Sequence, residues 1–289
     1  MANTINLVTK FQPLLDEVYK ASSLTTDLEN SAVKFDGSKT VKVLKLTVPP
    51  LGTYTRNTGY TAGDVTADWE PFTLTQDRGT EFSVDAMDDE ETLNMTFGKA
   101  SSEFLRRSVV PQVDAYRFAT MAGTTGISTT TGAALSTGAA AIAAISAAMV
   151  KMDEDEVTPE GRILYITPTL YGLINDLETY KSKAVMSRFA KVVQVPQTRF
   201  YTKVDIDATG FKKHEADSKV SGDTAGVNIN FLVVDPKAAF AVAKHKKLRV
   251  FTPDENQKSD DYLFQYRLYH DMFVYPQKAA GIYLHKATA

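Results

Sequence analysis

The most constraining feature of the sequence is a helical pattern over residues 88–122, which is longer than a small globular domain needs. Acidic residues 88–91 begin it, where negative charge favours the exposed amide groups and the positive end of the helix dipole. Its apolar residues recur at spacings of four, three and four, which places them on one face: Leu93, Phe97, Ala100 and Phe104. At ~1.5 Å per residue such a helix is about 50 Å long. The sequence therefore predicts a single long helix that spans several contacts and ends at Gly123.

Three residues within this helix predict an irregularity. Arg106 and Arg107 lie near its middle, and Pro111 follows them. Proline removes one backbone hydrogen bond and clashes with the preceding turn. We therefore expect a kink near Arg107, or two abutting helices.

Composition excludes several classes of protein. A chain of 289 residues with 43% hydrophobic residues can bury a large core, as one large or two ordinary domains. A net charge of −3 is not that of a polycation, so any nucleic-acid contact is local. The absence of cysteine excludes disulfides, thiolate metal sites and cysteine nucleophiles, and fits assembly in a reducing cytoplasm. Residues 1–19 lack the pattern of a secretory signal, and the apolar residues 139–152 are too few to cross a bilayer.

The first 35 residues are polar with scattered apolar side chains, among them Phe11, Leu14 and Leu15. This pattern suits an arm with a short amphipathic helix that needs a surface outside itself. An ordinary first helix packed on its own core fits the pattern equally well.

An extended hairpin is predicted next. Residues 40–48 are rich in β-branched side chains, and a second strand-like run from Phe72 continues past a turn at residues 77–79 to Val84. The long connection between the runs contains Tyr54, Arg56, Tyr60 and the only tryptophan, Trp69. Long connections tend to be functional or disordered, and aromatic residues argue against disorder. We therefore expect a hairpin that becomes ordered against a partner.

The rest of the chain predicts an inserted domain. Residues 122–138 are almost entirely Gly, Thr, Ser and Ala, which indicates a flexible connection and a domain boundary. Alternating helix and strand patterns follow, which is typical of an α/β domain: a helix around Ile142, a strand at 162–166, a helix at 167–177 and a strand at 230–234. Residues 203–226 are predicted to form a surface loop. Strands at 264–274 and 281–284 are expected to return and pair with the early strands.

One segment resembles a catalytic motif. Asp205-Ile206-Asp207-Ala208-Thr209 is similar to the Asp-x-Asp-x-Thr motif of haloacid-dehalogenase-type phosphotransferases, in which the first aspartate attacks phosphorus and the second is the acid/base. That motif ends a buried apolar strand near the N-terminus of its fold, and residues 200–204 do not provide one. A polar surface turn is therefore the favoured interpretation, and Ala216 rules out a calcium loop because it stands where the bidentate glutamate belongs.

Charged runs and histidines predict no metal, cofactor or catalytic site. The acidic residues 153–156 are interpreted as a solvated helix end rather than a cation site. The basic residues 244–247 with Arg249 are interpreted as a solvated turn rather than a phosphate contact. The histidines lack metal-ligand spacing, and His270 is predicted to be a satisfied residue packed on a strand face.

Short segments along nearly the whole chain, in their order, resemble the major capsid protein of tailed double-stranded DNA bacteriophages, with the Hong-Kong-97-type fold. They are Lys39-Thr-Val-Lys-Val43, Tyr54-Thr-Arg56, Leu74-Thr-Gln-Asp-Arg78, Val110-Pro-Gln-Val-Asp-Ala-Tyr-Arg117, Gly161-Arg-Ile-Leu-Tyr-Ile166, Val233-Val-Asp-Pro236, Tyr266-Arg-Leu-Tyr-His-Asp-Met-Phe-Val274 and Gly281-Ile-Tyr283.

The resemblance implies an α+β fold of five parts. Residues 1–35 would form the N-terminal arm, 36–86 the extended β-hairpin loop and its base, and 87–137 a peripheral domain with a long spine helix and linker. Residues 138–260 would form the inserted α/β axial domain, and 261–289 the return strands of the peripheral domain.

The resemblance also implies a structural function. Identical subunits would form the pentamers and hexamers of an icosahedral shell around viral double-stranded DNA, touched without sequence preference, in a virion assembled in the bacterial cytoplasm. A portal protein, with scaffolding or decoration proteins, would be the other partners, and no enzyme activity, cofactor or membrane is implied. An encapsulin-like cargo shell shares the fold and is the nearest alternative.

The residues implied in assembly fall into three groups. The extended loop would contact a neighbour through Tyr54, Arg56, Tyr60 and Trp69. The arm would do so through Phe11, Leu14 and Leu15. The geometry of the spine helix would depend on Arg106, Arg107 and Pro111.

Overall fold

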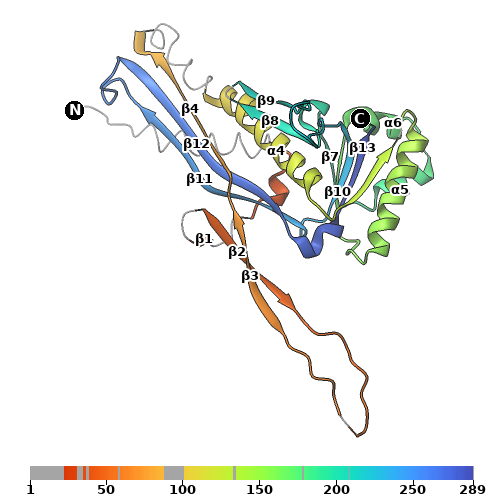
Figure 1. The fold of residues 1–289 in the computed structure, drawn as a ribbon. Helices are drawn as coiled ribbons and strands as arrows, with labels where there is room; N and C mark the ends of the chain where they lie inside the picture. The colour runs from red at the N-terminus through yellow and green to blue at the C-terminus, as the bar shows by residue number, and fades with distance from the viewer. Residues whose placement is uncertain are drawn as a thin grey trace.

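The computed structural model describes residues 23–30, 35–36, 39–57, 59–87, 101–132, 135–177, 179–207 and 209–288. Figure 1 shows three parts: a body of sheet and helices, a long narrow sheet beside it, and a hairpin that projects away from both. The predicted arm residues Phe11, Leu14 and Leu15, and residues 88–100 of the predicted long helix, lie outside the described residues.

The body is built on a five-stranded sheet of order β5-β13-β10-β6-β7. Its strands are β5 (Ser128–Gly132), β6 (Ile163–Ile166), β7 (Lys191–Gln194), β10 (Ile229–Val234) and β13 (Ile282–Ala287). Strand β10 is antiparallel to both neighbours, whereas β13–β5 and β6–β7 are parallel.

Helices cover both faces of this sheet. One face packs on α5 (Gly138–Glu154), α6 (Pro168–Asn175) and α7 (Tyr180–Met186), and the other on α4 (Val110–Gly123). Side chains of β6 alternate between the two cores, since successive residues of a strand point to opposite faces: Leu164 lies with Ile145 of α5, and Tyr165 lies with Phe118 of α4. The strand is therefore apolar throughout because both of its faces are buried.

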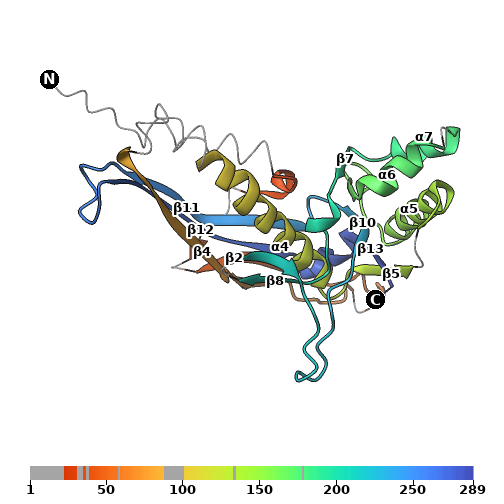
Figure 2. The ribbon, with the colours of Figure 1, turned by 90° about the horizontal axis from the view of Figure 1, so that it is seen from above.

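The long sheet has the antiparallel order β11-β12-β4, with β4 (Gln76–Asp85), β11 (Ala239–Phe251) and β12 (Asp261–Val274). Its apolar face packs against the start of α4 and the preceding turn (Figure 2). Phe82 stacks on Phe264 across the β4–β12 pair with ring centroids 4.5 Å apart, and Phe104 meets the same ring edge-on. This cluster fixes the helix along the sheet.

The projecting hairpin consists of β2 (Thr40–Thr47) and β3 (Thr66–Thr73), with the short β1 (Phe35–Asp36) beside β2. The two long strands pair from Thr40 opposite Thr73 to Thr47 opposite Thr66. The predicted extended hairpin is therefore confirmed.

Smaller elements join these parts. They are the 3-10 helices η1 (Thr26–Leu28), η3 (Gln197–Arg199) and η4 (Pro276–Gly281), and the hairpin of β8 (Val204–Asp207) and β9 (Gly210–Lys213). This last hairpin replaces part of the surface loop predicted at residues 203–226.

The irregularity predicted near Arg107 takes the form of a π-helical turn, η2 (Leu105–Val109), that leads into α4. Val110 N–H donates to the carbonyl of Leu105, five residues back. Pro111 has no N–H, so it leaves the carbonyl of Arg107 without its usual donor. The wider turn absorbs this defect.

Two predicted features were wrong in detail because cross-strand pairing overrides local sequence signals. The turn expected at residues 77–79 lies inside β4, where Asp77 is opposite Tyr269 and Gly79 opposite Arg267. A Cβ on Gly79 would lie 3.2 Å from the carbonyl oxygen of Tyr266, so the glycine permits close approach of β12. The basic residues 244–247 lie in β11, not in a turn.

The predicted flexible linker also contains structure. Residues Ser128–Gly132 form β5, and their threonine-rich backbone pairs in parallel with β13. Strand β12 pairs with the early strand β4, as predicted. The expected early partner for residues 281–284 was wrong, because β13 instead lies between β5 and β10.

Candidate functional site

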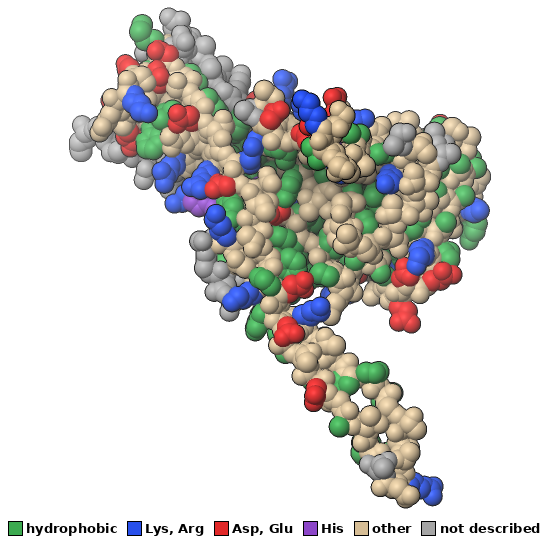
Figure 3. All heavy atoms as spheres, viewed as in Figure 1, with side chains coloured by type: hydrophobic (Ala, Val, Ile, Leu, Met, Phe, Trp, Pro, Cys, Tyr) green, Lys and Arg blue, Asp and Glu red, His purple; other side chains and the backbone are tan. Residues whose placement is uncertain are grey.

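Exposed apolar side chains concentrate on the projecting hairpin (Figure 3). Eight of the twelve large hydrophobic residues that are exposed in the described part of the chain belong to it: Leu44, Leu46, Val48, Leu51, Tyr54, Tyr60, Val65 and Trp69. Exposed apolar patches of this kind are typical of surfaces that bind another molecule.

The pairing of the hairpin explains how it presents these side chains. Trp69 lies directly opposite Leu44, and the two are 62% and 50% exposed. Cross-strand pairs of this type hold an antiparallel ribbon together, but a two-stranded hairpin alone is marginally stable in water. A surface laid against it would supply the missing burial.

The tip of the hairpin has local structure of its own. Thr55 and Gly59 exchange backbone hydrogen bonds, and Gly59 has a positive φ of 76°. The rings of Tyr54 and Tyr60 lie with centroids 5.0 Å apart, and Tyr60 remains 90% exposed. The structure therefore brings two predicted contact residues together at the tip, whereas Trp69 lies on β3.

The base of the hairpin is anchored on the long sheet by an apolar cluster. Val41 and Leu74 are buried against Phe240 and Val242 of β11. Phe72 adds aromatic contacts to this cluster, with its ring 5.8 Å from Phe240 and 5.1 Å from Phe273. The hairpin is thus fixed at one end only.

A buried polar network on α4 holds the segment that precedes the hairpin. The Asp114 carboxylate accepts hydrogen bonds from Ser23 Oγ (3.1 Å), Leu24 N–H (3.1 Å) and Thr25 Oγ1 (2.8 Å). Arg117 donates to Thr25 Oγ1 and to Glu29, each at 2.8 Å. Burial raises the pKa of Asp114, and these hydrogen bonds oppose the rise. No local sequence signal predicts this network, because its two halves are about 90 residues apart.

The predicted spine residues lie apart from the hairpin. Arg106 and Arg107 are exposed, and both form ion pairs with Glu103 one turn earlier, Arg106 at 3.9 Å. Pro111 is buried at the start of α4. Their role in shell geometry stays a prediction.

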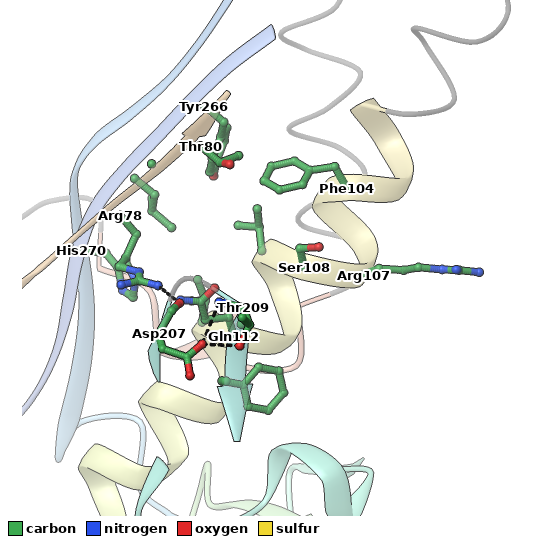
Figure 4. A pocket seen from close by; sticks show the side chains of 16 residues that line it. Arg78, Thr80, Phe104, Arg107, Ser108, Gln112, Asp207, Thr209, Tyr266 and His270 are labelled. Carbon is green, nitrogen blue, oxygen red and sulfur yellow. Dashed lines mark hydrogen bonds between the residues drawn. The ribbon is translucent and has the colours of Figure 1, made fainter. Parts of the chain in front are cut away.

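A cavity of about 500 Å³ lies between η2 and α4, the β4–β12 pair and the β8–β9 hairpin (Figure 4). Arg107 points away from it, whereas Arg78 reaches across and donates to the backbone carbonyl of Asp207. The cavity is half open, and Phe104, Ser108 and Gln112 line its helix side.

His270 lies in the wall of this cavity. It is only 4% exposed and meets the Tyr116 ring edge-on, 5.7 Å between centroids. Burial lowers its pKa to about 3. Among the described residues its Nδ1 has no hydrogen-bond partner. The prediction of a packed residue is confirmed.

The geometry around Asp205 and Asp207 does not favour phosphotransfer. Asp207 accepts from the backbone N–H (2.7 Å) and hydroxyl (2.6 Å) of Thr209, which lowers its pKa. Asp205 is engaged by His214 Nδ1 at 2.6 Å. Neither carboxylate ends a buried strand, and no group of three acidic or histidine side chains in the described ranges is arranged to hold a metal. Asp205 and Asp207 therefore belong to the polar β8–β9 hairpin, and the turn predicted for the motif begins only after Asp207.

His214, which follows β9, links strand β8 to the loop that contains Asp223. Its Nδ1 faces Asp205 and its Nε2 faces Asp223 at 2.9 Å, and these hydrogen bonds raise the pKa of His214. The pKa of Asp223 falls to about 2, mainly because the Asp217 N–H donates to it, with His214 second. Because the two carboxylates lie on opposite sides of the ring, these three residues form a structural cross-link and not a metal site.

The acidic run at residues 153–156 connects the end of α5 to other segments of the chain. Asp153 pairs with the fully buried Arg162 (2.8 Å) and with Arg188 (2.7 Å). Arg162 also donates to the carbonyls of Val157 and Thr158.

Within the described chain no helix is both long and apolar enough to cross a bilayer.

A long helix on a narrow antiparallel sheet, a projecting hairpin and a second sheet covered by helices define the Hong-Kong-97-type capsid fold, which confirms the predicted fold class. No protein family matches the sequence, and a search of curated proteins found no match.

Solved structures supply the particular likenesses. A virus-like particle from Pyrococcus furiosus is similar over 97% of this chain and 100% of its own, with TM-score 0.63 and 12% identity. Mycobacterium phage Che8 is similar over 91% and 90%, with TM-score 0.58 and 13% identity. The capsid of Myoviridae phage XM1 is similar over 92% of each chain, with TM-score 0.56 and 13% identity. At such low identity these likenesses establish the fold.

Proposed function

We propose that the chain is the major capsid protein of a tailed double-stranded DNA bacteriophage, which forms pentamers and hexamers of a closed icosahedral shell. The observation that carries the proposal is the projecting hairpin, whose large apolar side chains are exposed in its own subunit. The nearly full-length likeness to capsid structures supports it. No step of this function requires a catalytic group or a cofactor.

Assembly would use contacts between different surfaces of identical subunits, which close into rings. The hairpin would lie over a neighbour, with Tyr54, Arg56, Tyr60 and Trp69 in the contact. The arm would add Phe11, Leu14 and Leu15. Each contact would be weak, and many copies acting together would stabilise the shell.

The division of the chain follows the same proposal. Residues 1–35 serve as arm, 36–86 as extended loop and base, 87–137 as spine and linker, 138–260 as axial domain, and 261–289 as return strands. Arg106, Arg107 and Pro111 set the angle of the spine. The shell is the virion capsid, assembled in the host cytoplasm with a portal and with scaffolding or decoration proteins, and its inner surface touches DNA without sequence preference.

A shortened hairpin tests the proposal. Thr47 and Thr66 are directly opposite each other, so residues 48–65 can be replaced by Asn-Gly, which closes a two-residue turn. We expect a folded subunit with an unchanged thermal midpoint that forms no shells, as seen by negative-stain microscopy. Normal shells from this variant would contradict the proposed contact.

The contents of the shell separate the phage capsid from an encapsulin-like cargo shell. Particles purified from the producing cells that protect double-stranded DNA from nuclease support the viral function. Particles that instead retain a protein cargo and no DNA support the alternative.

A further inference from the structure

The direction of the projecting hairpin is decided at a two-residue joint. Strand β3 ends at Thr73 and β4 begins at Gln76, and the two strands belong to different sheets. Only Leu74 and Thr75 connect them. Any rotation between the hairpin and the long sheet must therefore occur at these two residues.

One buried carboxylate holds Thr75. Asp271 of β12 is 3% exposed and accepts from the Thr75 N–H at 2.7 Å and from its hydroxyl at 2.9 Å. It also accepts from the Tyr116 hydroxyl of α4 at 2.7 Å, and from the Met272 N–H at 2.8 Å. Three separate elements thus meet at Asp271. Hydrogen bonds to a carboxylate are short and directional, so they fix orientation as well as distance.

The other joint residue is held on both sides. Leu74 N–H donates to the carbonyl of Lys39 at 2.9 Å, and its own carbonyl accepts from the Tyr269 hydroxyl at 3.0 Å. Its side chain is buried in the apolar cluster at the hairpin base. Apolar packing keeps the base in place, but it is non-directional. The polar contacts therefore supply the orientation.

We infer that Asp271 is a positioning residue that sets the angle at which the β2–β3 hairpin leaves the long sheet. The lever is large. Strands of eight residues at ~3.4 Å per residue extend about 27 Å, so a rotation of about 10° at the joint moves the end of the paired strands by about 5 Å. A displacement of that size separates a docked hairpin from a missed contact.

Burial and the neighbouring Asp271 raise the pKa of Tyr116, which keeps its hydroxyl protonated as a donor across the physiological range. These hydrogen bonds to Asp271, called the clamp below, form within a single subunit. The consequence of the clamp for shell geometry rests on the proposed function, so the two are tested separately.

Two spin labels measure the angle directly. The chain contains no cysteine, so Leu51→Cys near the hairpin tip and Val150→Cys on α5 give unique labels at exposed positions. Full-length subunits are kept below the concentration at which they assemble, and double electron–electron resonance gives the distance distribution. We expect one narrow distance in the parent and a distribution about twofold broader in Asp271→Asn, because in either orientation its amide nitrogen faces a backbone N–H that already donates, that of Thr75 or that of Met272.

Matched variants keep the test decisive. Tyr116→Phe and Thr75→Ala each remove one donor and should broaden the distribution less, which provides a result if Asp271→Asn does not fold. Gln265→Ala on the same strand, whose side chain contacts Glu81 further along β4, should leave it unchanged. A distribution in folded Asp271→Asn, or in the Thr75→Ala and Tyr116→Phe double variant, that equals the parent's overturns the inference.

Microscopy of the same proteins distinguishes the two proposals. Shells from the parent and irregular particles from Asp271→Asn support both. If the parent forms no shells, the proposed function fails while the distance result still decides the clamp.

Discussion

Two β-hairpins in the described part of the chain, β8–β9 and β2–β3, have surfaces that differ in kind. The β8–β9 hairpin is polar, and the structure satisfies it internally: Arg78 reaches its Asp207 carbonyl, and His214 connects Asp205 to Asp223. The β2–β3 hairpin instead exposes apolar side chains such as Leu44, and its contacts with the body are confined to the base (Figure 3). The difference teaches that the first is complete within one subunit, whereas the second presents a surface whose burial requires another molecule.

The largest expected effect comes from removing the central aromatic side chain of the β2–β3 hairpin. Trp69→Ala should cost about 2 kcal/mol at each subunit contact, which raises the concentration needed for assembly about thirtyfold. The free energy of unfolding of the unassembled subunit should change by less than about 0.5 kcal/mol, because the side chain is exposed. Light scattering and urea unfolding measure the two quantities.

Tyr180→Ala is the matched control, since Tyr180 is 91% exposed on α7 and lies off the hairpin. Equal effects of the two substitutions on assembly would remove the distinction between the hairpin and the remaining surface.

A smaller, pH-dependent effect is expected for the β8–β9 region. The pKa of His214 is raised in the folded state, chiefly by its hydrogen bond with Asp205. Its stabilisation is therefore complete below the unfolded pKa of about 6.5 and is lost as pH rises through the higher folded value. The low pKa of Asp223, about 2, acts in the opposite sense: its stabilisation is present above about 3.9 and is lost toward pH 2.

Calorimetry of the parent and His214→Gln over pH 5 to 9 tests this. The difference in thermal midpoint should be largest at the acidic end and should shrink toward pH 9, and Asp205→Asn should weaken that trend. A difference that is constant with pH would mean that His214 contributes by packing alone.

The smallest effect is expected where the β8–β9 hairpin touches β4. Arg78→Ala removes one hydrogen bond at the rim of the cavity and should lower the free energy of unfolding by about 0.5 kcal/mol. Assembly should be unchanged. Arg56→Ala at the tip of the other hairpin should show the reverse pattern, and a loss of shells from Arg78→Ala would contradict the division between the two hairpins.

Features with a local signal were predictable from the sequence. The β-branched residues of β2, the apolar run of β6 and the break imposed by Pro111 all appear where expected. The fold followed from the order of short segments along the chain, and the exposed aromatic residues of the hairpin were found by their placement in an unusually long connection.

Features set by distant partners were not predictable. Charged residues on a helix, such as Asp114 and Arg117, are usually exposed. Here both are buried by residues 23–29. Strand β5 lies in a segment whose composition indicates a linker, because a ladder with β13 satisfies its backbone. In the sequence Asp271 is simply one residue of a predicted strand. Its role in positioning the hairpin depends on Thr75 and Tyr116, which distant parts of the chain supply.

The π-helical turn Leu105–Val109 makes the chain length at this point a determinant of orientation. Each residue of an α-helix advances by about 100° around the helix axis. An extra residue accommodated in one turn therefore rotates the side chains of residues 101–104 about that axis relative to those of α4. Phe104 packs on Phe264 and Tyr266 only in the present phase. Loss of one residue within the turn would restore regular winding and rotate that ring off the sheet, so this segment tolerates substitution far better than a change in length.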